Sequence, residues 1–345
     1  MAVDPVPYVV HGAKHSADVF RQAFHDSTGG AEGISTPTSF HVRQTGTPSN
    51  QVRVRPGGAI VLNTYSGGGG QSYAIRNASE TLVDVPASDS TGARSWYVIA
   101  RISDPQFAGP APATPEDGPY LFLECVSQSS TITDPHLKLA SVVVPASTAT
   151  VTNAMITSLR EVANPIVGQF TFARPRLMAD DDTRQNLLTA RFKGTNGEWH
   201  GEYFPGGDGS TNETRQFVPQ RATHMSVRAD WLAVRGVSNL NCHGRYWLEY
   251  GDEYRNHTWP GGRQLEFATQ QFAFDTTGTQ GSYRMNWALM DQVPIPAKLR
   301  GKEIRFAFKA GVSDNADRDG VMMNALSGLG LHVVFSMAPV DSDTV

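Results

Sequence analysis

The sequence of 345 residues has almost no cysteine, no long apolar run and no start typical of an exported protein. Cys125 and Cys242 are its two cysteines, a number that excludes a disulfide framework and a thiolate metal cluster. No apolar stretch approaches the ~20 residues that span a bilayer. The first residues carry Asp4 and two prolines where a signal peptide needs a basic stretch and an apolar core. These absences predict a protein made in a cytoplasm, without membrane insertion.

The sequence also lacks a strong excess of charge of either sign. Its net charge is −4, and both halves are near balance, with 10 Lys and Arg against 13 Asp and Glu in residues 1–165 and 19 against 20 in the rest. A nucleic-acid-binding face or a polybasic membrane surface needs a concentrated positive patch. We therefore expect neither nucleic acid nor a membrane as a partner.

A run of four glycines, residues 67–70, resembles a nucleotide-binding loop. A Walker loop places Lys and then Ser or Thr directly after its last glycine, whereas Gln71, Ser72 and Tyr73 follow here. A dinucleotide-binding loop opens a helix, but residues 71–86 have the pattern of short strands. The glycine run therefore predicts a hairpin tip rather than a phosphate site, and no cofactor is expected.

Residues 17–26 have the periodicity of an amphipathic helix. Val19, Phe20 and Phe24 fall on one face, and Ser16 is a suitable capping residue before the first turn. This pattern predicts a short N-terminal helix. Its apolar face can cap its own domain or dock on a neighbouring protomer, and both interpretations remain open.

Most of the remaining chain consists of short apolar or alternating runs separated by turn residues, which predicts a mainly β protein. Residues 153–163 are an exception, because their apolar spacing and the proline that follows predict a short connecting helix. A change of composition near residues 164–168 predicts two antiparallel β-sandwich domains, jelly-roll-like, over residues 1–165 and 166–345. The expected strands of the second domain are residues 168–175, 188–194, 223–234, 245–251, 271–277, 283–290, 303–312 and 330–339.

The segment 241–259 is rich in aromatic and carboxylate side chains. Aromatic rings can stack on sugar faces while carboxylates accept hydrogen bonds from hydroxyl groups. The alternation of a strand would instead bury one set of these side chains in a core, and this alternative stays open. The candidate contacts for a glycan or receptor are Trp247, Tyr250, Tyr254, Trp259, Asp252 and Asn256.

Two further patterns could indicate a catalytic site or a metal site, but a structural role is the simpler interpretation of each. Two of these carboxylates could form a glycosidase pair, but the sequence fixes no distance between them, and we expect no catalytic residue. Asn315, Asp317 and Asp319 match the opening of a calcium loop, but Leu326 stands at the twelfth position, where a bidentate Glu should close the site. A turn is the simpler interpretation, and no metal is expected.

Four longer stretches occur in a fixed order within about residues 10–165: HSADVFRQAFHDSTGGAEGI, VRVRPGGAIVLNTYSGGGGQSYAIRN, RSWYVIARISDP and DPHLKLASVVVPASTATVTNAMITSLREVANP. Together they resemble the N-terminal region of minor tail proteins of long-tailed phages that infect actinobacteria. In the second half, VPQRATHMSVRADWLAV and VPIPAKLRGKEIRFAFKAG resemble the C-terminal β-sandwiches of this family more loosely.

The resemblance implies a non-enzymatic structural protein of the virion tail, made in the host cytoplasm and placed at the tail tip or baseplate. It implies a homo-oligomer, taken here as a homotrimer, with other tail proteins and a host-envelope glycan as further partners. Val19, Phe20 and Phe24 are then the candidate oligomer interface. A host-surface carbohydrate-binding protein is the first alternative, and a polysaccharide depolymerase is the second.

Overall fold

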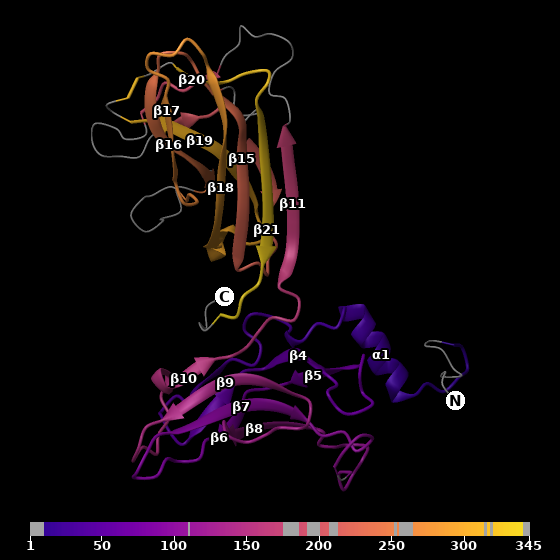
Figure 1. Cartoon of the computed structure of the whole chain (residues 1–345). Helices are drawn as coiled ribbons and strands as arrows, with labels where there is room; N and C mark the ends of the chain where they lie inside the picture. The colour runs from indigo at the N-terminus through magenta and orange to yellow at the C-terminus, as the bar shows by residue number, and fades with distance from the viewer. Residues whose placement is uncertain are drawn as a thin grey trace. The chain divides into compact units, whose positions relative to one another are not determined.

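The computed structural model describes residues 10–109, 111–174, 186–191, 201–206, 213–251, 254, 265–313, 316–317 and 320–340. The chain divides into two compact units, which Figure 1 colours from indigo to magenta and from magenta to yellow. Unit 1 comprises Met1–Pro165 together with Met337–Val345, and unit 2 comprises Ile166–Ser336.

The end of the chain returns to unit 1, which differs from the expected second domain of residues 166–345. Hydrogen bonds explain this return. The Met337 N–H donates to the Pro165 carbonyl (2.7 Å), and the Val340 N–H donates to the Pro37 carbonyl (3.1 Å). The buried Arg160 adds a bond from its Nη2 to the Val340 carbonyl (3.3 Å).

Unit 1 contains one α-helix and three small antiparallel sheets, with strand orders β1-β4-β5, β2-β3-β6 and β10-β9-β7-β8. These elements are α1 (Ala17–Thr28), β1 (Gly33–Ile34), β2 (Val42–Gln44), β3 (Gln51–Val54), β4 (Gly57–Leu62), β5 (Ser72–Asn77), β6 (Thr81–Asp84), β7 (Arg94–Ile102), β8 (Leu121–Ser127), β9 (His136–Val144), the 3-10 turn η1 (Asn153–Met155) and β10 (Ile156–Ser158).

The predicted N-terminal helix is confirmed as α1, which ends two residues later than expected. The Ser16 hydroxyl accepts a hydrogen bond from the Val19 N–H (3.3 Å), so it caps the first turn. Gly29 ends the helix in the left-handed region at φ 63°, where glycine has no steric penalty. Local signals therefore fix both ends of this helix.

The predicted connecting helix over residues 153–163 is wrong. The chain makes only the single 3-10 turn η1 and then extends as β10. β10 pairs with β9, with Ile156 opposite Val142, and Val162 forms a parallel bridge with Ile34. Pairing with distant strands satisfies the backbone here, and it overrides the weak helical spacing of the apolar side chains.

The glycine run 67–70 forms the tip of the hairpin between β4 and β5, as predicted. The two strands pair from Gly57 opposite Asn77 to Leu62 opposite Ser72. Gly67 and Gly70 have φ angles of 85° and 75°, which is the left-handed conformation that a tight connection demands of glycine. The loop turns the chain.

Unit 2 contains two antiparallel sheets. The first has the order β11-β21-β15-β20-β12, with β18 also paired to β15, and the second has the order β13-β19-β16-β17, with β14 also paired to β19. These elements are β11 (Ile166–Arg174), β12 (Asn186–Leu187), β13 (Glu202–Tyr203), β14 (Glu213–Phe217), β15 (His224–Gly236), β16 (Asn241–Tyr250), β17 (Gln270–Asp275), β18 (Tyr283–Pro294), the 3-10 turn η4 (Ala297–Leu299), β19 (Glu303–Val312), β20 (Val321–Met323) and β21 (Gly328–Ser336).

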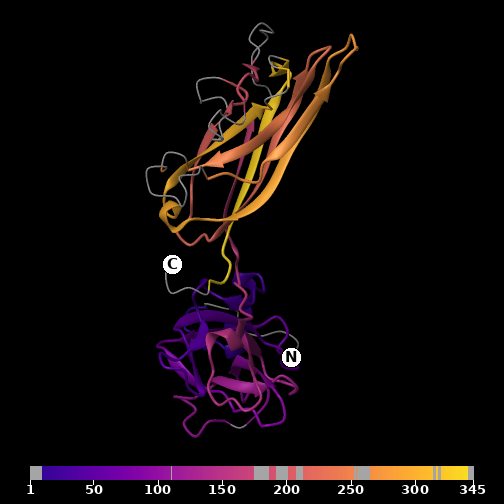
Figure 2. The same cartoon turned by 90° about the vertical axis from the view of Figure 1, so that its left-hand side faces the viewer.

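One aromatic core joins the two sheets of unit 2, whose long strands run side by side in Figure 2. Trp231 of β15 meets Tyr246 of β16 and Phe308 of β19 edge-on, with ring centroids 5.1 and 4.9 Å apart. Trp287 of β18 stacks on Tyr246 and on Phe272 of β17 at 4.9 and 4.4 Å. A core shared by two facing sheets is a β-sandwich, and the predicted mainly β fold with antiparallel sheets is confirmed.

Three further expectations can be compared with the structure. The described part of the predicted strand 188–194, residues 188–191, forms no strand beyond a single bridge at Arg191. Cys125 and Cys242 are free and lie in different units, in agreement with the excluded disulfide framework. No helix within the described ranges is both long and apolar enough to cross a bilayer.

Candidate functional site

Helix α1 is held to unit 1 by polar side chains. Arg21 is the centre of this contact, and its side chain is only 11% exposed. Its guanidinium donates to Asp18 (2.7 Å) on the same helix, to Gln71 (2.6 Å) before β5, and to Asp104 (3.3 Å) and Gln106 (2.7 Å) after β7. The guanidinium thus joins three segments that are far apart in the sequence.

Aromatic rings and further hydrogen bonds complete this Arg21 cluster. The guanidinium carbon lies 5.5 Å from the ring centre of Tyr73 and 5.2 Å from that of Phe107. Burial alone would raise the pKa of the Asp18 carboxyl, but hydrogen bonds from Gln106, Gln71 and Arg21 together hold that pKa below its ordinary value. Burial, followed by the hydrogen bond to Asp104, raises the pKa of the Tyr73 hydroxyl.

This arrangement leaves the apolar side chains of α1 partly exposed to solvent. None of the helix residues is buried. Phe20 is 50% exposed, while Val19 and Phe24 are half-buried. A hollow of about 500 Å³ lies between the helix and β5, and we call it the α1 groove. Its lining residues are Phe20, Arg21, Ala23, Phe24, Ser27, Ser72, Tyr73 and Ala74.

The glycan-contact candidates of segment 241–259 divide into three groups. Trp247 and Tyr250 are buried, with 1% and 4% of their surface exposed, so neither offers a ring face to a glycan, and their expected contact role is wrong. Tyr254 is half-buried, and its hydroxyl donates to the Glu303 carbonyl (3.0 Å) while the Lys302 ammonium lies 4.8 Å from its ring centre. Trp259, Asp252 and Asn256 lie outside the described residues.

Trp247 is buried because both faces of β16 are covered. The indole N–H donates to the Glu249 carboxylate (3.1 Å). The backbone of Gly201 lies so close to the indole that a Cβ at this position would be 2.3 Å from a ring carbon. The strand alternation predicted one buried set of side chains, and the structure buries both Tyr246 and Trp247.

Of the three residues of the calcium-loop pattern, only Asp317 is among the described residues. The Asp317 carboxylate accepts a hydrogen bond from the Asn241 N–H (2.8 Å), and the Asp317 N–H donates to the Asn241 carbonyl (2.9 Å). Asn315 and Asp319 lie outside the described residues. In the part of the chain that the structure describes, no three His, Cys, Asp or Glu side chains are grouped to hold a metal ion.

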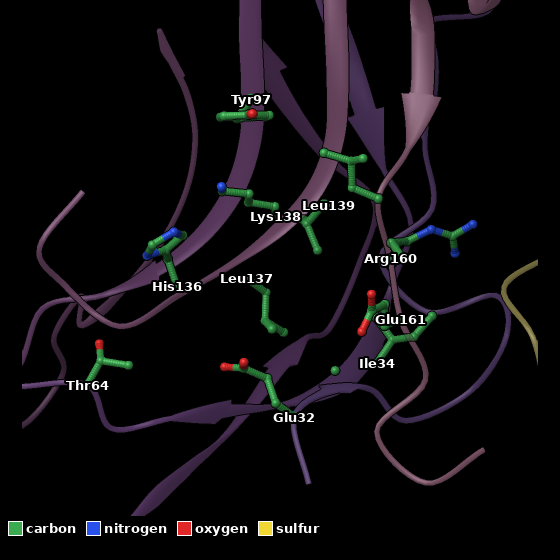
Figure 3. Close-up of a pocket in the computed structure, with 12 residues that line it drawn as sticks. Glu32, Ile34, Thr64, Tyr97, His136, Leu137, Lys138, Leu139, Arg160 and Glu161 are labelled. Carbon is green, nitrogen blue, oxygen red and sulfur yellow. The ribbon is translucent and has the colours of Figure 1, made fainter. Parts of the chain in front are cut away.

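A second hollow of unit 1, of about 610 Å³, was not expected from the sequence. Figure 3 shows it, and we call it the β1–β9 pocket. Four aliphatic side chains and six polar ones surround it, together with Gly33 and Arg160. These residues are Ile34, Leu137, Leu139 and Leu159, and Glu32, Thr64, Tyr97, His136, Lys138 and Glu161.

Close backbone contacts hold two walls of the pocket together. The Ile34 N–H donates to the Glu161 carbonyl (2.7 Å), and the Ala163 N–H donates to the Ile34 carbonyl (3.0 Å). Gly33 has a φ of 127°, and a Cβ there would lie 2.3 Å from the Glu161 carbonyl oxygen. Glycine is therefore required for β1 to approach residues 161–163 this closely.

Two local features shape the wall of the pocket. The pairing of β7 with β9 shifts by one residue between Val98 and Ile99, which leaves Leu139 as the extra residue of a β-bulge in the pocket wall. Arg160 points away from the pocket in Figure 3. Its Nη1 donates to the Pro37 and Ser39 carbonyls (3.1 and 3.0 Å). The anchored Arg160 therefore fixes the segment that carries the neighbouring pocket residues.

The polar rim of the pocket carries charges of both signs. The Lys138 ammonium lies 4.6 Å from the ring centre of Tyr97. His136 Nδ1 lies 2.8 Å from the Asp134 carbonyl, to which it donates, so its Nε2 is left as an acceptor in the neutral ring. Glu32 accepts the Leu62 N–H (3.1 Å). The carboxylates of Glu32 and Glu161 and the ammonium lie around Leu137 in Figure 3.

No protein-family model matches this chain, and no curated protein matches it. Among solved structures it is similar to one of infectious bursal disease virus, Gx strain, with 8% identity, 89% of this chain and 80% of that chain covered, and a TM-score of 0.26. It is also similar to dimeric latent PorU from Porphyromonas gingivalis, with 10% identity, 92% and 26% covered and a TM-score of 0.26. Arcelin-5, a lectin-like defence protein from Phaseolus vulgaris, has 10% identity, 50% and 99% covered and a TM-score of 0.22.

Particles of infectious bursal disease virus recur among these neighbours. At TM-scores this low, the likeness carries no argument about the function of this chain.

Proposed function

We propose that this protein is a non-enzymatic structural component of a virion, a minor tail or baseplate protein of a long-tailed phage. It assembles as a homotrimer with other tail proteins and contributes to attachment at the host surface. The four stretches that follow one another in a fixed order within residues 10–165 support the tail assignment, because together they resemble the N-terminal region of minor tail proteins. The antiparallel β architecture of both units is compatible with it.

The open apolar side of α1 is the observation that carries the assembly role. A surface helix normally buries its apolar residues on its own domain. Here the Arg21 cluster anchors the helix through polar groups, while Phe20 and the α1 groove stay accessible. We assign Val19, Phe20 and Phe24 to the contact with a neighbouring protomer, because such a contact would cover the exposed ring of Phe20 and the groove beside it.

Light scattering of the purified chain tests this proposal. We expect a trimer for the unaltered chain and a monomer for Phe20→Ser, because the substitution removes the exposed ring from the contact. Leu82→Ser is the matched control, since Leu82 is similarly exposed (54%) but lies on β6, and it should remain trimeric. A monomeric unaltered chain, or a Phe20→Ser variant with the same mass as the control, would overturn the assembly role.

The depolymerase alternative has a separate test. A glycosidase needs two carboxyl groups flanking the scissile bond. Release of reducing sugar from host-envelope polysaccharide by the purified chain would replace the non-enzymatic proposal with this alternative.

A further inference from the structure

We propose that the β1–β9 pocket binds a neutral saccharide. This inference rests on the proposed function for its setting, since it would give the virion component a glycan contact in unit 1. It also moves the expected glycan contact away from Trp247 and Tyr250, which are buried, and onto side chains that surround an open hollow.

The rim carries charges of both signs, so no ligand of a single charge suits all of it. An anion attracted by the ammonium of Lys138 would also meet the carboxylates of Glu32 and Glu161, and a cation attracted by these carboxylates would also meet the ammonium. Like charges brought together cost binding free energy. A sugar hydroxyl both donates and accepts hydrogen bonds, so a neutral polyol can donate to the carboxylates and accept from the ammonium in the same pose.

The floor and the size of the pocket fit a sugar ring. A pyranose has an apolar C–H surface on its faces and hydroxyl groups around its perimeter. The half-buried Leu137 and the more exposed Leu159 offer an apolar surface for the former, above the buried Ile34 and Leu139, and the polar rim surrounds it. The volume of about 610 Å³ falls within the range typical of small-molecule sites.

The polar groups of the rim are available to a ligand. Within the described residues, no hydrogen bond or ion pair is formed by the Glu161 carboxylate, the Thr64 hydroxyl or the Lys138 ammonium, whose partner is the Tyr97 ring. The backbone is nevertheless fixed at two of them, because the Glu161 carbonyl is bonded to Ile34 and the adjacent Arg160 is anchored, and because Lys138 lies on β9, which is paired with β7. The backbone of such a site loses little conformational freedom when a ligand binds, and a small loss of conformational freedom favours affinity.

Saturation-transfer NMR titrations with defined sugars test the proposal. The neutral probes are the methyl glycosides of glucose, galactose and mannose, and the charged probes are glucuronate, galacturonate, glucosamine and galactosamine. We expect at least one neutral glycoside to bind saturably. Its acidic and amino counterparts should bind about five- to tenfold more weakly, because each brings a charge to a like charge on the rim.

Rim variants assign the binding to this pocket. Glu161→Gln and Lys138→Gln should each weaken the neutral glycoside about fivefold, since a hydrogen bond to a charged group is lost. Glu161→Gln should in addition narrow the gap between the neutral and acidic sugars, and Lys138→Gln the gap between the neutral and amino sugars. Glu116→Gln and Lys14→Gln are the matched controls at exposed positions outside the pocket, and neither should change binding.

Three results would overturn the inference. These are the absence of saturable binding of every neutral glycoside, stronger binding of a charged sugar than of its neutral counterpart, and unchanged binding in both rim variants. Each variant is first compared with the unaltered chain by thermal unfolding, which shows that it is folded. Assembly is measured separately by light scattering, so a loss of sugar binding and a loss of the proposed tail function are distinguishable.

Discussion

Arg21 of α1 and Asp104 of the loop after β7 are 83 positions apart in the sequence, yet they form an ion pair of 3.3 Å. Tyr73 of β5 donates its hydroxyl to the same carboxylate oxygen (2.9 Å). Helix, strand and loop are therefore joined at one carboxylate. This arrangement explains how α1 stays in place without a buried apolar face.

Replacement of Arg21 by leucine should release α1 from unit 1. The substitution leaves the Asp18 and Asp104 carboxylates without their guanidinium partner, and the loss of such charge-assisted hydrogen bonds costs about 2–3 kcal/mol. The expected result is a loss of amide protection over Ala17–Thr28 in hydrogen exchange. Arg94→Leu is the control, because its pair with Asp89 is exposed and should contribute less than about 1 kcal/mol. Equal protection in both variants would contradict the anchoring role of Arg21.

The stability of unit 1 should fall in acid because of Asp18. The folded-state pKa of this carboxyl is lowered, so the folded state favours its ionised form. Its contribution is fully present above the ordinary pKa of about 4, and it is lost as the pH falls through the lowered folded value. Urea unfolding between pH 6 and pH 3 measures this loss, and Asp18→Asn should have a flatter pH dependence.

Asp26→Asn provides the comparison on the same helix. Asp26 accepts a hydrogen bond from Gln22 (3.0 Å) and is exposed. This variant should keep the pH dependence of the unaltered chain. The assignment to Asp18 is contradicted if the two variants have the same slope.

The core position of Trp247 predicts a stability effect instead of a binding effect. Trp247→Ala should destabilise unit 2 by about 3–5 kcal/mol, the cost of a large buried cavity. Urea unfolding followed by circular dichroism checks this value. Met290→Ala on β18 is the control, since Met290 is 72% exposed and should change the unfolding free energy by less than about 0.5 kcal/mol. If Trp247→Ala had the stability of the unaltered chain, the core position of Trp247 would be contradicted.

Local sequence signals were sufficient for α1 and for the long strands, and they failed where distant segments decide the conformation. Ser16 and Gly29 act on their own helix and could be recognised from the sequence. Leu159 and Glu161 were placed on an expected helix, whereas bridges to β1 and β9 extend this segment. In an extended segment, alternation puts both side chains on one face, and the helical interpretation missed this.

The pocket itself could not be predicted, because its walls come from residues 32–34, 64, 97, 136–139 and 159–161. No short motif connects these positions. The bulge at Leu139 depends on the register between β7 and β9, and a single sequence does not specify that register. The sequence did indicate that acceptor groups and an aromatic ring are suited to a glycan, but it assigned them to a strand that is covered on both faces.

Gly33→Ala should damage the pocket and the fold of unit 1 together. An alanine Cβ at this position would lie 2.3 Å from the Glu161 carbonyl oxygen, in a left-handed conformation at φ 127°, so β1 must move away from residues 161–163. We expect a destabilisation of at least about 2 kcal/mol, measured by urea unfolding, and weaker binding of the neutral glycoside. Gly46→Ala is the matched control, because a Cβ there meets no atom within 4 Å. If Gly33→Ala were as stable as this control, the close approach of β1 to Glu161 would not be needed to form the pocket wall.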